Sequence, residues 1–402
     1  MTAVANPADR CLWLGPIMSR LAVDELPALS PAAVEWQRGF IGGLMAEGVQ
    51  VHAISHRPAP LWPRGPLLPG NQSVPSDVTC PTRLVGYVNA PIVRSSWLAK
   101  AYVRAIDDFV SAWQPNFVAT FNVLPWHVLA AKAASERHQI PWLSFLLDDV
   151  SSDPTLEKYA RLSRAAAGHV VVSAEAVNRL RQLNPSARIL HIDGGVDHFH
   201  DLDKSDAAAI PPSILYCGSH TDEAGMGVLV EAIPLVPQKD VSFVITGNRG
   251  SHDGLARLAA RDPRVRLMGL VSPEELDALC ESATAFVNPR PPEHALSIAS
   301  FPSKLLRYLS FGKPIASTWT PGLSADYRSL LVLAEDGSPK SLADAIQKAI
   351  SLDSASRDAV RLAARGFLVP GRLWATQARK FVEFVNDVLR PLPQRMRGVT
   401  LS

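Results

Sequence analysis

Residues 117–147 read FVATFNVLPWHVLAAKAASERHQIPWLSFLL, and this stretch decides the fold class. It holds a short apolar run at 117–120, a segment of helical periodicity at Pro125–His138 and a second apolar run at 142–147. A strand, a helix and a strand at this spacing predict a βαβ unit, in which a crossover helix joins two parallel strands. The helical segment opens with a proline, which is favoured in the first turn because its missing N–H would have no partner there.

The same alternation fills the rest of the chain. Upstream, strands are expected at 11–14 and 49–55 around a helix at 30–47, with Ser30 as N-cap and Pro31 in the first turn. Downstream, a helix at Ala174–Leu183, capped by Ser173, separates strands at 169–173 and 189–192. Beyond residue 213 we expect strands at 214–217, 242–246, 265–268, 285–288, 314–317 and 331–333, and helices at 225–235, 255–261, 272–281, 302–310 and 341–350.

This order predicts an α/β protein with two doubly wound, Rossmann-like domains that face one another across a cleft. We expect an N-terminal domain at 1–200, a second domain at 201–372, and a terminal segment at 373–402. The polar stretch at 198–212 has the composition of a linker, and seven prolines at 58–81 predict a surface loop. A last helix at 373–389, after a loop at Pro370-Gly371, is expected to cross back to the first domain.

Composition excludes several classes of protein. Of the 402 residues 47% are hydrophobic and 19% charged, which is ordinary for a folded chain, and 40 Lys and Arg balance 38 Asp and Glu, which argues against nucleic-acid binding. The four cysteines show neither zinc-ligand nor disulfide-framework spacing. The polar N-terminus and the lack of a long apolar run predict a cytoplasmic protein, with contact to the inner face of a membrane through a local basic patch left open.

The segment SFPSKLLRYLSFGKP at 300–314 has the features of an anion site. A helix that starts at Pro302 would leave the backbone N–H groups of Ser303, Lys304 and Leu305 free at its positive end, beside the Lys304 ammonium. Such a site suits a diphosphate. The alternative is that Ser300 only caps the helix and that Lys304 is solvated.

These residues also resemble a known family. The stretch SFPSKLLRYLSFGKPIAS at 300–317 looks like the donor-site segment of retaining glycosyltransferases of the GT-B fold, family 4 type, and is closest to the branch that builds bacterial exopolysaccharides. In the same order, Tyr216-Cys217-Gly218-Ser219, Gly247-Asn248 and the segment 265–271 are similar to the family's second-domain strands and glycine turns. The likeness spans most of the chain and is specific between about 214 and 318.

The resemblance implies an enzyme that moves a sugar, with retention of configuration, from a nucleotide diphosphate sugar to a sugar or lipid-linked acceptor hydroxyl. The donor is a substrate, and no other cofactor is implied. The second domain has no DxD-like carboxylate pair that could hold a diphosphate-bound metal, so no metal is expected. The residues expected at the donor site are Gly218, Ser219, Gly247, Asn248, Leu270, Val271, Arg290, Pro302, Ser303, Lys304 and Leu305. Of these, Leu270 and Val271 would contact the base through backbone groups. Arg290 could equally be a surface residue.

Two departures from the family pattern bear on donor binding. Many members carry two glutamates with seven residues between them, where this chain has Ala299 and Arg307, and an Arg and a Lys where it has Ser219 and Ala224. Donor binding is therefore expected to depend more on Lys304 and the helix dipole. Arg307 is compatible with a repositioned nucleotide, with a different donor, or with a domain that no longer binds a donor. Glu293 and His294 in the preceding loop could replace the missing ribose-binding carboxylate, or they could belong to a solvated loop.

In the first domain the candidates are Gly15, in the Gly15-Pro16 turn that could face the diphosphate, and His127 with Asp148 at the rim of the cleft. For His127 the alternative is a packed or exposed helix histidine. For Asp148 and its neighbour Asp149 it is a loop or helix-cap pair.

The segment 94–113 mixes Arg94, Lys100 and Arg104 with Trp97, Leu98 and Tyr102. This composition is compatible with a basic amphipathic face on anionic lipid or with an ordinary helix packed on the sheet.

A non-catalytic GT-B protein that acts as a binding or scaffolding partner is the second hypothesis for function, favoured by Arg307. A nicotinamide-dependent enzyme ranks last, because Gly225-Met226-Gly227 does not open a full GxGxxG motif.

Overall fold

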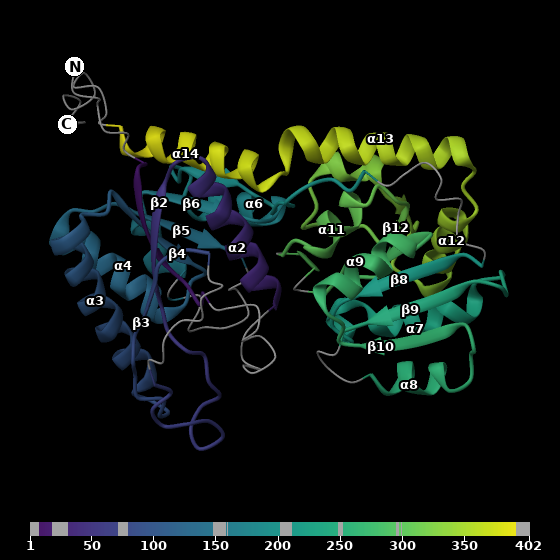
Figure 1. The fold of residues 1–402 in the computed structure, drawn as a ribbon, viewed down its shortest axis with the longest axis horizontal. Helices are drawn as coiled ribbons and strands as arrows, with labels where there is room; N and C mark the ends of the chain where they lie inside the picture. The colour runs from purple at the N-terminus through teal and green to yellow at the C-terminus, as the bar shows by residue number, and fades with distance from the viewer. Residues whose placement is uncertain are drawn as a thin grey trace. The chain divides into compact units, whose positions relative to one another are not determined.

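The computed structural model describes residues 8–17, 31–70, 79–147, 158, 160–201, 211–247, 252–294, 297–298 and 300–390. The chain forms two compact units, which Figure 1 shows in ribbon form. Unit 1 comprises Met1–Val171, Leu180–Ile192 and Trp374–Ser402, and unit 2 comprises Val172–Arg179 and Asp193–Leu373.

Unit 1 is built on a seven-stranded sheet whose strands are all parallel. The strand order is β3-β2-β1-β4-β5-β6-β7. The chain adds strands on one side of β1 as far as β3, then returns to place β4 on the other side, so the sheet is doubly wound with its switch point between β1 and β4. The strands are β1 (Arg10–Leu14), β2 (Gln50–Ser55), β3 (Thr82–Leu84), β4 (Phe117–Phe121), β5 (Trp142–Leu146), β6 (Gly168–Val171) and β7 (Ile189–His191).

Helices cover both faces of this sheet, and β1 shows why. Its side chains alternate: Cys11 and Trp13 enter one core with α2 and α14, whereas Leu12 and Leu14 enter the other with α3 and α4. The helices of unit 1 are α2 (Pro31–Ala46), α3 (Arg94–Trp113), α4 (Pro125–His138), α6 (Ala174–Leu183), which straddles the division between the units, and α14 (Trp374–Leu389), with a short 3-10 turn η1 (Ser163–Ala165).

Two glycines of α2 bring α14 close to it. A Cβ at Gly43 would lie 2.6 Å from the backbone oxygen of Trp374, and one at Gly39 would lie 2.1 Å from the Trp374 indole. The indole in turn meets Trp36, with ring centroids 5.4 Å apart, and Phe381 meets Phe40 at 5.3 Å. The last helix therefore belongs to the core of unit 1 although 182 residues lie between the end of β7 at His191 and its first residue, Trp374.

Unit 2 repeats the architecture with a six-stranded parallel sheet in the order β10-β9-β8-β11-β12-β13. Its switch point lies between β8 and β11. The strands are β8 (Ser213–Cys217), β9 (Ser242–Thr246), β10 (Val265–Gly269), β11 (Ala285–Asn288), β12 (Ile315–Ser317) and β13 (Val332–Leu333). The helices are η2 (Asp222–Ala224), α7 (Met226–Ala232), η3 (Ile233–Leu235), α8 (Asp253–Ala259), α9 (Pro273–Ser282), α11 (Lys304–Ser310), η4 (Ala325–Leu330), α12 (Pro339–Ile350) and α13 (Ser354–Gly371).

The two doubly wound α/β sheets confirm the predicted fold class, and the predicted bounds of α4, α6, β9 and β11 are those observed. The loop predicted at Pro370-Gly371 is wrong: these residues form the end of α13, an 18-residue helix that begins after the N-cap Asp353. Pro370 has no N–H to donate to the carbonyl of Gly366, so the last turn of α13 has one hydrogen bond fewer, and the Arg372 N–H still donates to the Leu368 carbonyl at 2.7 Å. The cap predicted at Ser30 lies outside the described residues. Among the described helices, none combines the length and apolar character needed to cross a bilayer.

Candidate functional site

The switch point of the second sheet gathers most of the residues predicted at the donor site. Gly218 follows β8, and Pro289 and Arg290 follow β11, so both segments lie at the carboxyl edge where doubly wound sheets bind ligands. Gly225, at the entry to α7, has φ +88°, and a Cβ there would lie 2.0 Å from the Pro289 carbonyl oxygen. Glycine is therefore required for the close approach of these two loops.

Lys304 extends from the first residue of α11 toward the end of β8. Its Nζ lies 4.1 Å from the centroid of the Tyr216 ring, and a Cβ at Gly218 would stand 2.8 Å from that nitrogen. The Tyr216 hydroxyl donates to the carbonyl oxygen of Ser219 at 2.7 Å, which fixes the turn after the strand. Gly218, with φ +150°, thus leaves room for an ammonium group directly above the turn.

The charge at this edge is positive. Burial lowers the pKa of Lys304 to about 8, and the Arg290 guanidinium acts in the same direction. Arg290 is held by a hydrogen bond from its Nη2 to Ser300 Oγ at 2.9 Å and by its carbonyl oxygen, which accepts from Thr318 Oγ1. Lys304 and Arg290 repel one another at this edge. A bound polyanion would relieve that repulsion, so the pair favours the binding of a polyanion.

The start of α11 differs from the prediction. The helix begins at Lys304, not Pro302, and Ser303 stands at the N-cap without a side-chain cap bond. The N–H of Leu305 donates to the Pro302 carbonyl at 2.9 Å, so it is not a free anion donor, and the Leu305 side chain is buried in the core. Since the helix has only seven residues, anion binding at this edge rests on the Lys304 side chain rather than on a helix dipole.

Arg307 points to α9 instead of replacing a lost glutamate. Its Nη2 donates to Asp277 Oδ1, and the pair joins α11 to α9. The next residue, Tyr308, accepts a hydrogen bond from the N–H of Cys217 at 2.9 Å through its hydroxyl and so ties α11 to the end of β8. The arginine that departs from the family pattern is thus paired within unit 2.

Sequence reasoning missed a histidine beside Lys304. Within the described part of the chain no hydrogen-bond partner is found for the buried Nε2 of His220, and burial, with smaller contributions from Lys304 and His252, lowers the pKa of His220. His252 caps α8, since its Nδ1 accepts from the N–H of Leu255, and its Nε2–H donates to Asp222 Oδ1 at 3.2 Å. The only sequence signal was the position of His220 two residues after Gly218.

Residues predicted near the base lie at the ends of the next two strands. A Cβ at Gly247, which has φ +120°, would lie 2.0 Å from the Gly218 carbonyl oxygen, and the N–H of Gly247 donates to the Gly269 oxygen at 2.8 Å. Leu270 is exposed and Val271 is partly buried directly after β10. The structure therefore brings Gly218, Gly247 and 269–271 together, while Asn248 lies outside the described residues.

His127 is buried, as the alternative of a packed helix histidine expects, and its predicted role in catalysis stays a prediction. Its side chain is fully buried, Nδ1 donates to the Phe121 carbonyl at 3.3 Å, and Nε2 accepts from the Tyr102 hydroxyl at 3.1 Å. Burial lowers the pKa of His127 to about 3, so the ring is neutral. The same Tyr102 hydroxyl lies 3.0 Å from His56 Nδ1, which makes a buried chain of three polar side chains.

Gly15 stands at the end of β1, at the switch point of the first sheet. A Cβ there would lie 2.2 Å from Gln37 Oε1 and 2.7 Å from Trp13 Nε1, two atoms that are hydrogen-bonded to each other at 2.9 Å. Packing against α2 thus explains this glycine. Its role toward a diphosphate stays a prediction, as does that of Asp148, which lies outside the described residues.

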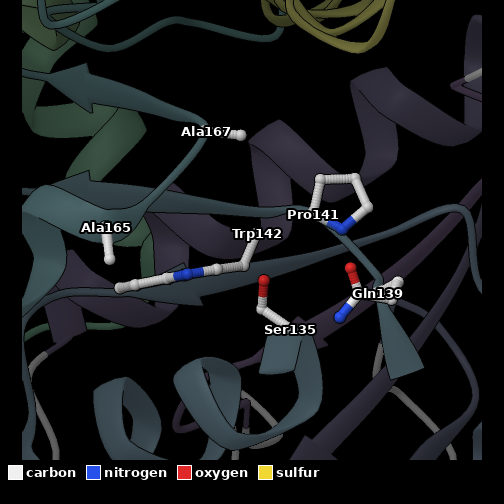
Figure 2. Close-up of a pocket in the computed structure, with 6 residues that line it drawn as sticks. All are labelled: Ser135, Gln139, Pro141, Trp142, Ala165 and Ala167. Atoms are coloured by element: carbon white, nitrogen blue, oxygen red, sulfur yellow. The ribbon is translucent and has the colours of Figure 1, made fainter. Parts of the chain in front are cut away.

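A pocket of about 230 Å³ lies elsewhere in unit 1 (Figure 2). Its lining comes from the end of α4, the start of β5, and the end of η1 with the residues after it, namely Ser135, Gln139, Pro141, Trp142, Ala165 and Ala167. This is the amino edge of the sheet, and the lining includes no charged side chain. The pocket therefore shares neither position nor chemistry with the predicted site.

Comparison with known proteins supports the same domain. Residues 211–351 match the sequence profile of the family described as "Glycosyl transferases group 1". None of the curated proteins compared with the chain matches it. The profile covers the sheet of unit 2 with Gly218, Arg290 and Lys304, and it spans 141 of the 402 residues.

Solved structures show the fold. Sucrose-phosphate synthase from Thermosynechococcus elongatus is 16% identical with a TM-score of 0.65, and the alignment covers 94% of this chain and 99% of that one. Anabaena Alr3699/HepE in complex with UDP and glucose is 14% identical with a TM-score of 0.65 and the same coverage. A glycosyltransferase from Rickettsia africae ESF-5 is 16% identical with a TM-score of 0.65, covering 95% and 98%. Both units thus match GT-B glycosyltransferase structures along nearly their whole length.

Proposed function

We propose that the chain is a glycosyltransferase that moves a sugar from a nucleotide diphosphate sugar to an acceptor hydroxyl, with unit 2 as the donor domain. The observation that carries the proposal is the pair of cations, Lys304 and Arg290, at the switch point of the sheet that the family profile covers. A diphosphate is the polyanion that this family's substrates carry. UDP is the first nucleotide to test, because Anabaena HepE has been crystallised with UDP, with UDP and glucose, and with UDP-glucose.

The proposed reaction requires the protein to stabilise the charge on the leaving diphosphate, and it requires no covalent intermediate with the protein. The bond from the anomeric carbon to the diphosphate oxygen breaks, the diphosphate leaves with the electron pair, and a new bond forms to the acceptor oxygen. The acceptor proton passes to the leaving diphosphate. Lys304 and Arg290 would stabilise the negative charge that grows on the diphosphate, and they need no rearrangement to do so.

His220 completes this set. Its Nε2 is buried without a hydrogen-bond partner among the described residues, two positions after Gly218. A buried polar atom of this kind costs stability unless something bonds to it. We assign that nitrogen to the nucleotide diphosphate sugar, in place of the cations that Ser219 and Ala224 do not supply.

The finer assignments follow the sequence resemblance. We propose retention of configuration, a hexosyl donor, a sugar or lipid-linked acceptor held by unit 1, and a place in bacterial polysaccharide or glycoconjugate synthesis on the cytoplasmic side. We also propose that no metal is needed, since Lys304 and Arg290 would supply the positive charge that a diphosphate requires. Activity that survives EDTA would support this point.

Calorimetry with UDP, GDP, dTDP, ADP and CMP tests the donor site. A nucleotide at about a hundred times its Kd should stabilise unit 2 by about 2.7 kcal/mol, so a thermal shift accompanies binding. Lys304→Met should lose both, whereas Lys340→Met, which alters an exposed lysine of α12 paired with Asp344, should keep both. A folded wild-type protein that binds none of the five would contradict the proposal and favour the non-catalytic scaffolding protein.

A further inference from the structure

Unit 1 carries a concentrated group of exposed apolar side chains. Ile92 is 99% exposed, Leu68 68%, Trp97 50% and Trp62 48%. We call this group the apolar patch; it consists of Leu61, Trp62, Leu67, Leu68, Ile92, Val93 and Trp97. Contiguous exposed apolar surface on a folded protein marks an interaction site more often than single exposed residues do.

Hydrogen bonds hold the two segments of the apolar patch side by side. The buried Asn89 accepts from the N–H of Trp62 through its carbonyl at 3.1 Å and donates its own N–H to Leu67 at 2.8 Å. Its side-chain Nδ2 donates to the carbonyls of Pro60 at 2.6 Å and Pro66 at 3.0 Å. The proline-rich loop is thus fixed against the turn that leads into α3, and the apolar side chains are presented by an ordered surface.

Ile92 shows that the exposure has a cost. It has φ +72° at the tip of the turn, a conformation that is rare for a β-branched residue, and almost its whole side chain is in solvent. Within the described part of unit 1, the exposed Ile92 side chain makes no packing contact that would offset this strain. A glycine would remove the strain, so the isoleucine is better explained by something that binds it.

Most charged residues near the apolar patch in the sequence are basic. Residues 48–106 contain six Lys and Arg and one acidic residue, Asp77; Asp107 and Asp108 follow on α3, and Asp108 pairs with Arg83 at 2.8 Å. On α3 the spacing places Val93, Trp97, Lys100 and Arg104 on one face, while Leu98 and Tyr102 on the opposite face are fully buried. The helix therefore packs on the sheet through Leu98 and Tyr102. Its exposed face carries Lys100 and Arg104 beyond the apolar patch, followed one turn later by Asp108.

We propose that the apolar patch and its flanking cations, Arg64, Lys100 and Arg104, dock unit 1 on an anionic lipid surface. Indole rings and aliphatic side chains insert at the level of the headgroups, and arginine and lysine bind their phosphates. Each cation near an anionic surface strengthens binding about fivefold. A protein partner that binds through apolar contacts alone is disfavoured, because the exposed Arg64, Lys100 and Arg104 lie next to the apolar patch in the sequence.

The position of the apolar patch is consistent with this role. The proline-rich loop leaves β2 at its carboxyl end, and α3 begins at the same edge of the sheet (Figure 1). Ligands of doubly wound sheets bind at that edge. If the proposed function holds, docking would bring the acceptor side of unit 1 to the headgroups, where a lipid-linked acceptor lies.

Vesicle sedimentation with the full chain tests the proposal without reference to activity. The wild-type protein should bind vesicles of equal parts phosphatidylcholine and phosphatidylglycerol, and not phosphatidylcholine alone, and added salt should weaken the binding. Neutralising Arg64, Lys100 and Arg104 together to Gln should lower the partition coefficient by on the order of a hundredfold. Absence of binding by the wild type to anionic vesicles overturns the proposal.

Ile92→Gly separates docking from folding. It removes the most exposed apolar side chain and relieves the strained backbone, so vesicle binding should fall while the melting temperature is kept or raised. Leu362→Ser is the matched control, since Leu362 is 69% exposed on α13 of the other unit. Equal vesicle binding by wild type, Ile92→Gly and the triple Gln variant would contradict the proposal.

Discussion

The affinity for a nucleoside diphosphate should fall at alkaline pH because the ammonium of Lys304 must carry its charge to bind it. The pKa of Lys304 in the free protein is about 8. The apparent Kd then rises by the factor 1 + 10^(pH − pKa), which is about 1.1 at pH 7 and about 11 at pH 9. Calorimetry with UDP should therefore show binding about tenfold weaker at pH 9 than at pH 7, a loss of about 1.4 kcal/mol.

Lys304→Arg provides the control for this pH dependence. A guanidinium stays protonated at pH 9, so the variant should bind UDP with the same affinity at both pH values, whatever its absolute strength. The terminal phosphate of UDP, with a second pKa of about 6, is already about nine-tenths ionised at pH 7 and adds little slope. A wild-type affinity that is flat between the two pH values, or an equal slope in the arginine variant, would refute the assignment of Lys304 to the diphosphate.

Three further changes follow from particular contacts. Lys304→Met should raise the free energy of unfolding by up to about 3 kcal/mol at pH 7. Folding lowers the pKa of Lys304 from 10.5 to about 8 and so disfavours the charged side chain, which methionine replaces. In thermal unfolding at pH 10, where Lys304 is mostly neutral in the folded protein, the gain over wild type should be smaller. Gly43→Ala should be less stable in urea unfolding than Gly42→Ala by about 1–3 kcal/mol. Both variants gain helix propensity, but only the methyl group at position 43 would clash with the Trp374 backbone. Equal stabilities would contradict the packing described for α14. His220→Ala should weaken UDP binding by about two- to tenfold in calorimetry, and unchanged binding would remove His220 from the site.

Local pattern was enough to predict the fold. Buried parallel strands read as short apolar runs, and the proline that opens α4 and the serine that caps α6 mark those helices without help from tertiary contacts. The same rules failed at Pro370, where the helix continues through a residue that normally ends one and stops one residue later, at Gly371. Glycine and proline signals are reliable for where a helix stops only to within a turn.

The candidate site was predictable in part. Gly218, Gly247 and Lys304 could be placed together because strand ends in a parallel sheet share one edge. The surroundings of His127 could not be predicted, since its burial depends on Tyr102, 25 residues away in another helix. The pairing of Arg307 with Asp277 and the position of His220 beside Lys304 likewise depend on which helix faces which, and no local pattern encodes that.

The contribution of α14 to the first core sets an order on synthesis. The side chains of Phe381 and Val385 fill the same core as Phe40 and Phe117, yet they are translated after the whole of unit 2. At about 5–20 residues per second the ribosome needs roughly 10–40 s to pass from the end of β7 to α14. During that interval unit 2 can complete its own sheet, whereas the nascent first unit presents the aromatic surface of α2 uncovered. Chaperones that recognise exposed aromatic side chains should therefore engage the first part of the nascent chain and leave it when α14 arrives.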